Sequence, residues 1–170
     1  TPKDVKAAIQ GPMTKVYDGT TDVIGAARNS LGTIRTANDM VSLTGLIAGD
    51  GATNQSTASY DDKNVGAGSK SITYDVKIDP MNAGNYRLVD AMGAAITAPI
   101  TTTNNTITAR RVNVTFGNVS KSFDGTSTNT TIDPSVSAAD AAVLNRDIAG
   151  LVNGSNKLTN LGGIVSNYGR

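Results

Sequence analysis

Apolar and polar residues alternate along several short stretches of this chain, and the pattern is clearest at residues 71–79. The apolar positions in that stretch are Ile72, Tyr74, Val76 and Ile78. Polar residues stand between them, so that one face of the segment is apolar and the other is hydrophilic. Because successive side chains of a β-strand point to opposite faces, this period of two predicts a strand with one buried face.

Shorter alternating runs predict further strands. One run places Val5, Ala7 and Ile9 on a single face, and a cleaner one places Val112, Val114 and Phe116 on a single face. Tyr86 and Leu88 share one face of another predicted strand. Residues 94–108 are rich in Thr and Ile and predict a final strand, followed by a linker with the sequence TTTNN.

Short strands separated by turns rich in Gly and Asn indicate an all-β fold. We expect small antiparallel sandwiches of the Ig-like kind, arranged in tandem. The alternative is a β-grasp-like sheet holding one short helix at residues 134–144, because Asp133 and Pro134 suit a helix start and the alanines that follow keep helical spacing. A β-solenoid would show a period of about 20–30 residues, and none is visible.

The chain contains an internal repeat. The segment KVYDGTTD at residues 15–22 returns as KSFDGTST at residues 121–128, so that Asp124 lies 106 positions after Asp18. Three further landmarks recur in the same order, 105 to 108 positions apart. Because four landmarks share nearly one spacing, the sequence predicts two copies of a unit of about 106 residues.

The two copies predict two domains. Residues 1–107 form the first repeat, and residues 108–170 form a second, truncated repeat that lacks the counterpart of residues 62–91. Since the strongest predicted strand lies in that segment, we expect the second repeat to have an unpaired sheet edge and an uncovered apolar face. Residues outside this chain or another molecule would then complete it, unless its fold closes earlier.

The repeated corner has a structural interpretation. In the first copy Tyr17 is expected to cover one edge of a small core, Asp18 to accept hydrogen bonds from the backbone two residues on, Gly19 to take a positive φ, and Thr20 to begin the next strand. Asp-Gly is a strong turn signal. The same roles are expected in the second copy for the turn residues Phe123, Asp124, Gly125 and Thr126.

Composition excludes several classes of function. The chain has no His and no Cys, which removes the commonest general base, thiolate metal sites and disulfides. We therefore expect a protein that is not an enzyme and has no cofactor. The net charge of +1 comes from interspersed charges, so nucleic acid is not an expected partner. No apolar stretch is long enough for membrane insertion.

Two sharper kinds of chemistry rest on residue type alone. The candidate oxygen ligands for calcium are Asp18, Asp22, Asp61 and Asp62, although their spacing matches no EF-hand loop and solvated turn carboxylates are the alternative. A Lys–Asn isopeptide crosslink would need an amine, an amide and a carboxylate shielded together. The candidates for it by type are Lys15, Lys77, Asn85 and Asp75.

The order of KVYDGTTD, GLIAGD, SYDDKNVGAGSK and MNAGNYRLVD resembles the YDG-type repeat of large secreted bacterial proteins, which is similar in setting to the MBG domains. The resemblance covers nearly all of residues 1–107. It is weaker over residues 108–170, where SFDG replaces YDG and GLVNGS replaces GLIAGD. Such repeats occur in tandem in surface adhesins that resemble filamentous haemagglutinin.

The resemblance implies a non-catalytic stalk or adhesion repeat of a bacterial surface or secreted adhesin, which spaces or presents a binding region. Its expected partners are neighbouring repeats of the same chain, with a host glycan or surface protein as a further partner. The expected location is extracellular, on the bacterial cell surface or secreted. The alternative is a dedicated carbohydrate- or host-protein-binding module with one specific site.

Overall fold

A computed structural model describes residues 1–118, 120, 122–126, 128–129, 134–159 and 166–167. The chain divides into two compact units, Thr1–Arg110 and Arg111–Arg170, and each is described by itself. Within the described residues no helix is both long enough and apolar enough to cross a membrane.

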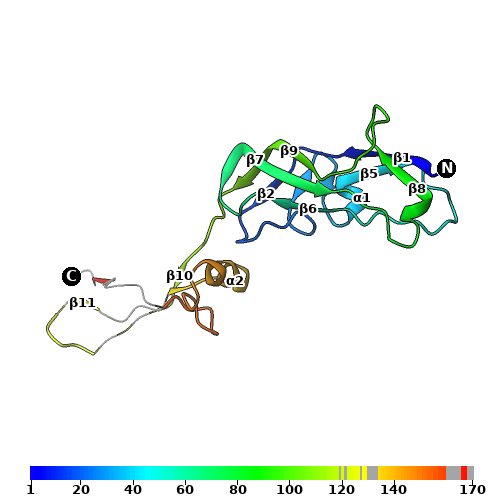
Figure 1. Cartoon of the computed structure of the whole chain (residues 1–170). Coiled ribbons are helices and arrows are strands. Elements are labelled where there is room, and N and C mark those ends of the chain that lie inside the picture. Colours follow the sequence, from blue (N-terminus) through cyan, green and yellow to red (C-terminus); the bar gives the residue numbers. More distant parts are fainter. Residues whose placement is uncertain (119, 121, 127, 130–133, 160–165, 168–170) are drawn as a thin grey trace. The chain divides into compact units, whose positions relative to one another are not determined.

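The first unit is built mainly of short strands (Figure 1). They are β1 (Lys3–Ile9), β2 (Thr14–Val16), β3 (Arg28–Asn29), β4 (Gly32–Thr33), β5 (Val41–Thr44), β6 (Thr57–Tyr60), β7 (Gly66–Asp75), β8 (Tyr86–Val89) and β9 (Ile100–Thr108). Two short helical segments, α1 (Ala37–Met40) and η1 (Ala83–Asn85), lie between strands. The fold is therefore mostly β, as the sequence predicts.

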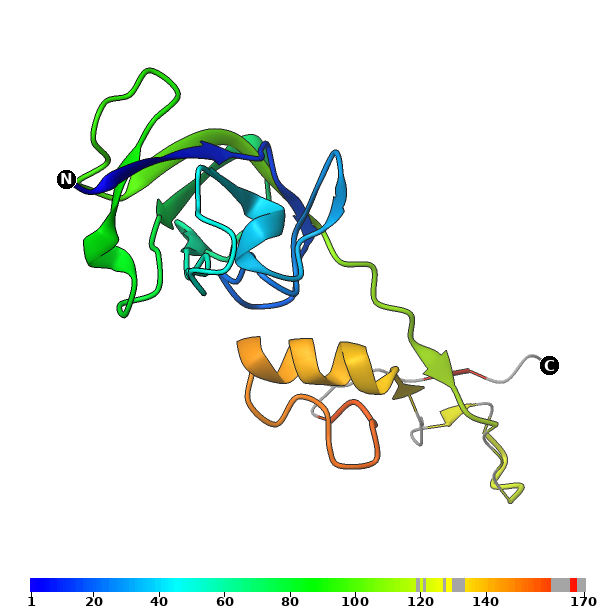
Figure 2. The same cartoon turned by 90° about the vertical axis from the view of Figure 1, so that its right-hand side faces the viewer.

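The strands form two curled sheets (Figures 1 and 2). One has the order β4-β3-β2-β9-β7-β6 and the other has the order β5-β1-β8. The expectation of purely antiparallel pairing is wrong, because β2 pairs with β9 in parallel and β1 pairs with β8 in parallel. Strands β1 and β2 follow one another closely, and each pairs with a strand that the chain reaches only after a long connection, which is the connection that parallel pairs need.

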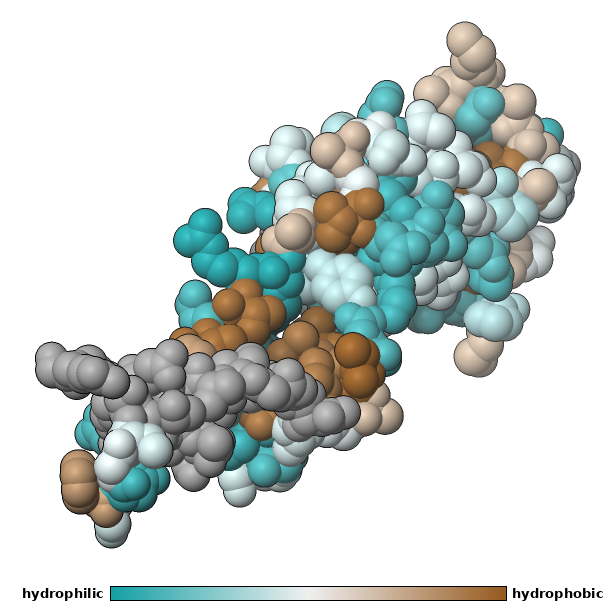
Figure 3. All heavy atoms as spheres, turned by 90° about the vertical axis from the view of Figure 1, so that its left-hand side faces the viewer, coloured by the Kyte–Doolittle hydropathy of each residue, from teal (hydrophilic) through white to brown (hydrophobic). Residues whose placement is uncertain are grey.

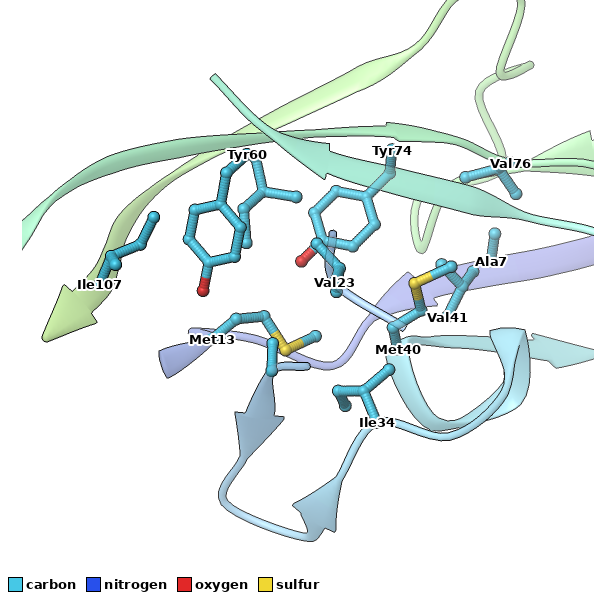
Figure 4. Packing of buried hydrophobic residues seen from close by; sticks show 12 residues of the cluster. Ala7, Met13, Val23, Ile34, Met40, Val41, Tyr60, Tyr74, Val76 and Ile107 are labelled. Atoms are coloured by element: carbon cyan, nitrogen blue, oxygen red, sulfur yellow. The ribbon is translucent and has the colours of Figure 1, made fainter. Parts of the chain in front are cut away.

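The core of the first unit lies between the strands and the segment that carries α1. Figure 4 shows the rings of Tyr60 and Tyr74 extending from their strands toward Met13 and Met40. All four side chains are buried. The strand predicted at residues 71–79 contributes as expected, since its four inward positions are all buried, although β7 itself begins earlier and ends at Asp75.

The prediction of a linker at TTTNN is wrong. Residues 101–105 lie inside β9, and Asn105 is fully buried. Thr suits the extended backbone of a strand. The Asn105 carboxamide is paired inside the fold, because its Oδ1 accepts from Met13 N at 2.9 Å and its Nδ2 donates to Lys70 O at 3.2 Å.

The second unit contains shorter elements. They are β10 (Thr115–Phe116), β11 (Thr128–Asn129), β12 (Pro134–Ser135), α2 (Ala138–Asp147) and β13 (Ser166–Asn167). Strand β10 pairs with β12, and β11 pairs with β13. A small cluster formed by Val136, Ala141 and Val152 is buried beside α2.

The helix expected at residues 134–144 starts later than the sequence suggests. Ser137 is the N-cap, and its hydroxyl accepts from Asp140 N at 3.1 Å. Pro134 instead lies in β12, three residues before this cap. The sequence thus predicts the helix but not its boundary.

The strand predicted around residues 112–116 is also shorter than expected. Only β10 forms there, Val114 is 41% exposed and Phe116 is 62% exposed. An alternating pattern buries a face only where a second layer covers it. In the described part of the second unit no long strand corresponding to β7 is present to provide that layer.

The face of the first unit seen in Figure 3 mixes hydrophilic and near-neutral residues with scattered apolar ones. Exposed large apolar residues of this unit stand mostly in loops and include Leu31, Ile47, Met81 and Met92. Single exposed apolar residues are normal on a protein surface.

Candidate functional site

The corner at residues 15–22, between β2 and β3, is built around one carboxylate. Asp18 Oδ1 accepts hydrogen bonds from Thr20 N at 2.9 Å and from Thr20 Oγ1 at 2.8 Å. Gly19 between them has a φ of 76°, in the left-handed region that favours glycine. The three residues therefore form an Asx-turn that closes on itself.

A buried ammonium group lies inside this corner. The Lys15 side chain is 0% exposed, and its Nζ lies 2.8 Å from Asp18 Oδ1. The same Nζ donates to Thr20 O at 3.0 Å, Thr20 Oγ1 at 3.2 Å and Asp22 O at 3.1 Å. Four acceptors therefore surround three N–H donors, and the amine is held as a charged structural group.

The corner is attached to the sheet through Tyr60. Lys15 Nζ lies 5.6 Å from the centre of the Tyr60 ring, within the range of a cation–π contact. The backbone N–H of Tyr60 donates to Thr21 O at 2.9 Å, and its hydroxyl donates to Thr106 O at 3.3 Å. One tyrosine thus connects the corner to β6 and β9.

Burial and hydrogen bonding in the corner shift the pKa of two groups. Burial raises the pKa of the Asp18 carboxyl, but hydrogen bonds from Lys15 and Thr20 outweigh it and leave the pKa below its ordinary value. Burial, with contributions from Tyr74 and Asp18, raises the pKa of the Tyr60 hydroxyl. Asp18 therefore stays ionised and Tyr60 stays protonated near neutral pH.

Comparison with known protein families shows to which family this chain belongs. The model of the YDG domain matches residues 1–98. The chain belongs to the YDG domain family. No curated protein and no solved structure matches the chain. The tripeptide Tyr17-Asp18-Gly19 of the corner is therefore a turn of a YDG domain, positioned by a buried lysine.

The second corner has the same turn but a different setting. Asp124 Oδ1 accepts from Thr126 N at 2.9 Å and from Thr126 Oγ1 at 2.8 Å, and Gly125 has a φ of 79°. Tyr17 packs against the core of the YDG domain. Phe123 is 95% exposed, which corrects the expectation that its ring covers a core edge. The described part of the second unit has no counterpart of the β7–β9 layer for the ring to pack against. Lys121, which the spacing aligns with Lys15, lies outside the described residues.

The SYDD segment of the YDG domain holds a second buried lysine. The Lys70 side chain is 7% exposed, and its amine pairs with Asp62 Oδ1 and, at 3.4 Å, with Asp61 Oδ1. The hydrogen bond from Lys70, with one from Asn64 N, lowers the pKa of Asp62. The carboxylates that follow Tyr60 therefore neutralise a cation of the protein itself.

The proposed calcium ligands do not gather. Asp18 pairs with Lys15, whereas Asp61 and Asp62 pair with Lys70. Nowhere in the described ranges do three acidic side chains meet as a metal site would need. A lysine amine thus occupies the place beside Asp18, and another the place beside Asp61 and Asp62, where a cation would have to bind.

The proposed crosslink residues are also not shielded together. Lys77 is 57% exposed and pairs with the Asp75 carboxylate, which is 44% exposed. Asn85 lies exposed in η1. Lys15 is the one candidate that is buried, and its amine is engaged by Asp18, Thr20 and Asp22.

Sequence reasoning overlooked Lys15 and Lys70 as buried groups. A signal for Lys15 exists around β2, where Lys15 and Met13, the residue just before the strand, are buried while Val16 is 53% exposed. A lysine at an inward position of an alternating strand, five residues before a threonine in an Asp-Gly turn, indicates a buried amine that needs acceptors.

Proposed function

We propose that this chain is a non-catalytic stalk or adhesion repeat of a bacterial surface or secreted adhesin, with units of a sandwich-like fold in tandem. Membership of the YDG family supports this proposal. The repeated landmarks support it as well, because two copies of one unit in a row are what an extended array would contain.

The path of the chain through the first unit carries the proposal. Strand β1 begins at Lys3, and its seven residues extend over about 20 Å. Strand β9 leaves parallel to β2, with Thr108 next to Val16. Figures 1 and 2 both show the N-terminus at the opposite end of the unit from the end of β9. A unit that the chain enters at one end and leaves at the other adds its whole length to an array.

The corner suits a unit of this kind. Lys15 holds the turn by its charge, and Asn105 holds β9 to the segment before β2. Such internal polar contacts give rigidity without disulfides, and the chain has no cysteine. Units repeated along a stalk would also present any weak binding patch many times, so that avidity would exceed the affinity of one unit.

The location of the protein tests this proposal. An antibody raised against the chain should label intact cells of the bacterium that encodes it, or detect the protein in the culture medium. The same antibody applied after permeabilisation measures the internal pool, and a cytoplasmic marker controls for lysis. Detection confined to permeabilised cells would contradict an adhesin repeat.

A further inference from the structure

The first unit has a pocket whose lining includes none of the residues of the YDG corner or of the SYDD segment. Its volume is about 290 Å³, and it lies among the segment after β1, the β3–β4 hairpin and α1. Its lining includes Gln10, Asn29, Leu31, Thr33, Asn38 and Asp39.

The floor of this pocket is preformed by Asn29, which is 9% exposed. Its Nδ2 donates to Gln10 O at 2.7 Å and to Asp39 O at 3.1 Å. Its Oδ1 accepts from Leu31 N at 2.9 Å and from Gly32 N at 3.2 Å. One carboxamide thus holds all three walls in place, and the pocket needs little rearrangement to receive a ligand.

The walls carry polar groups that the fold does not use. In the described part of the chain the side chains of Asn38 and Thr33 make no hydrogen bond, and the Gln10 amide makes only a long one of 3.4 Å to Ala8 O. Asp39 uses Oδ2 to accept from Arg35 N and Thr36 N, at 2.9 and 2.8 Å. Leu31 is 79% exposed and supplies an apolar wall.

Charge and geometry restrict the ligand. Asp39 is the one charged side chain among the lining residues, so the pocket has no cation for an anionic ligand and too few carboxylates for a metal ion. Strand β4 has two residues, and a peptide added at that edge would gain few backbone hydrogen bonds. Amide and hydroxyl groups beside an aliphatic wall match a ligand with several hydroxyls and a C–H face.

We propose that this pocket binds one residue of a neutral saccharide. The amides of Asn38 and Gln10 would pair with neighbouring hydroxyls, and Leu31 would contact the C–H face of the ring. No aromatic ring lines the pocket, so binding by one unit is weak, with a Kd on the order of 1 mM. The biological meaning of such a site rests on the proposed adhesive function, in which repetition compensates for weak affinity.

A titration followed by ¹H–¹⁵N correlation spectra of the whole chain tests the site. The probes are glucose, galactose, mannose and N-acetylglucosamine, each added separately. We expect at least one of them to cause saturable shifts that are largest at Gln10, Leu31 and Asn38.

Matched variants assign the binding to the pocket. Asn38→Ala and Leu31→Ala should each weaken binding roughly five- to tenfold. The controls Asn85→Ala, an exposed asparagine in another short helical segment, and Met81→Ala, an exposed loop side chain, should leave it unchanged. Spectra without sugar show whether each variant is folded, and Leu31→Ala remains informative if Asn38→Ala disturbs α1.

Two results would overturn the site. One is the lack of saturable shifts with all four sugars, and the other is binding that Asn38→Ala and Leu31→Ala leave unaltered. Neither concerns the location of the protein. Surface labelling without sugar binding would leave a stalk repeat with no saccharide site, whereas sugar binding by a protein confined to the cytoplasm would retain the pocket and reject the adhesin.

Discussion

Two lysines of the first unit keep their amines inside the fold, and each is matched by a carboxylate nearer the surface. Lys15 is paired with Asp18, and Lys70 is paired with Asp62. Burying a charge is costly unless hydrogen bonds and an opposite charge surround it. These residues therefore stabilise the unit only as complete sets, and removal of one member leaves its partners unpaired.

Lys15→Met tests the set at the corner. The methionine keeps most of the volume but leaves Asp18 and the carbonyls of Thr20 and Asp22 without their donor. We expect the free energy of unfolding in urea to fall by about 2–3 kcal/mol. The control Lys77→Met removes an exposed ion pair and should cost less than about 1 kcal/mol. Equal losses for the two variants would show that burial of Lys15 is unimportant.

The Asp18 carboxyl predicts a dependence of stability on pH. Its pKa is lower in the folded chain than its ordinary value, so its contribution is present above the unfolded pKa and is lost as the pH falls through the folded pKa. Asp18→Asn cannot titrate, and its stability should fall less steeply than that of the wild type between neutral pH and about pH 2. Urea unfolding at several pH values measures both slopes, and parallel curves would contradict the assignment.

At the scale of elements, turns and backbone contacts decide where strands can lie. The GLIAGD segment follows β5, and its Gly45, with a φ of 113°, lies against Asp4 and Val5 of β1. Farther along this turn Ile47 N donates to the Tyr86 hydroxyl at 3.2 Å, and that hydroxyl also contacts the Asp50 carboxylate. The turn therefore connects β5 and β8 on either side of β1.

Gly45→Ala tests this close approach. An added Cβ would lie 2.9 Å from Asp4 O, a backbone atom that cannot rotate away, and the positive φ adds strain. We expect a loss of roughly 2–4 kcal/mol in the free energy of unfolding. Gly49→Ala is the matched control, because its φ is also positive but its Cβ would meet nothing within 4 Å. A loss no larger than that of the control would show that strand spacing does not depend on Gly45.

At the scale of the whole molecule, the two units differ in what they bury. The first has an extensive apolar cluster that includes Met13, Tyr60 and Tyr74. In the second, the described cluster centres on Val136, Ala141 and Val152. Because stability on this scale follows buried apolar area, the first unit is expected to fold on its own and to unfold at the higher temperature.

Residues 1–110 alone should therefore unfold cooperatively, with a Tm within a few degrees of the main transition of the whole chain. A difference of 1 kcal/mol corresponds to about 4–8 °C for a domain of this size, so calorimetry is sensitive enough. Residues 111–170 alone should show no sharp transition. A cooperative transition in that fragment would show that the second unit is self-sufficient.

What could be predicted from the sequence was local. The Asx-turns at Asp18 and Asp124 involve residues two positions apart, and the alternation around Ile72 and Tyr74 needs only a neighbouring layer. A buried strand and a tight turn depend on side-chain shape and hydrogen bonding over a few residues, and a single sequence contains that information.

Only the tertiary structure decided which strands pair and which polar side chains are buried. Asn105 is polar, and the sequence placed it in a linker, yet it is buried because Met13 N, 92 positions away, needs an acceptor. Likewise β2 pairs in parallel with β9, a strand that the chain reaches only after a long connection. The physical reason is that burial of a polar group depends on partners distant in sequence, which periodicity and propensity cannot specify.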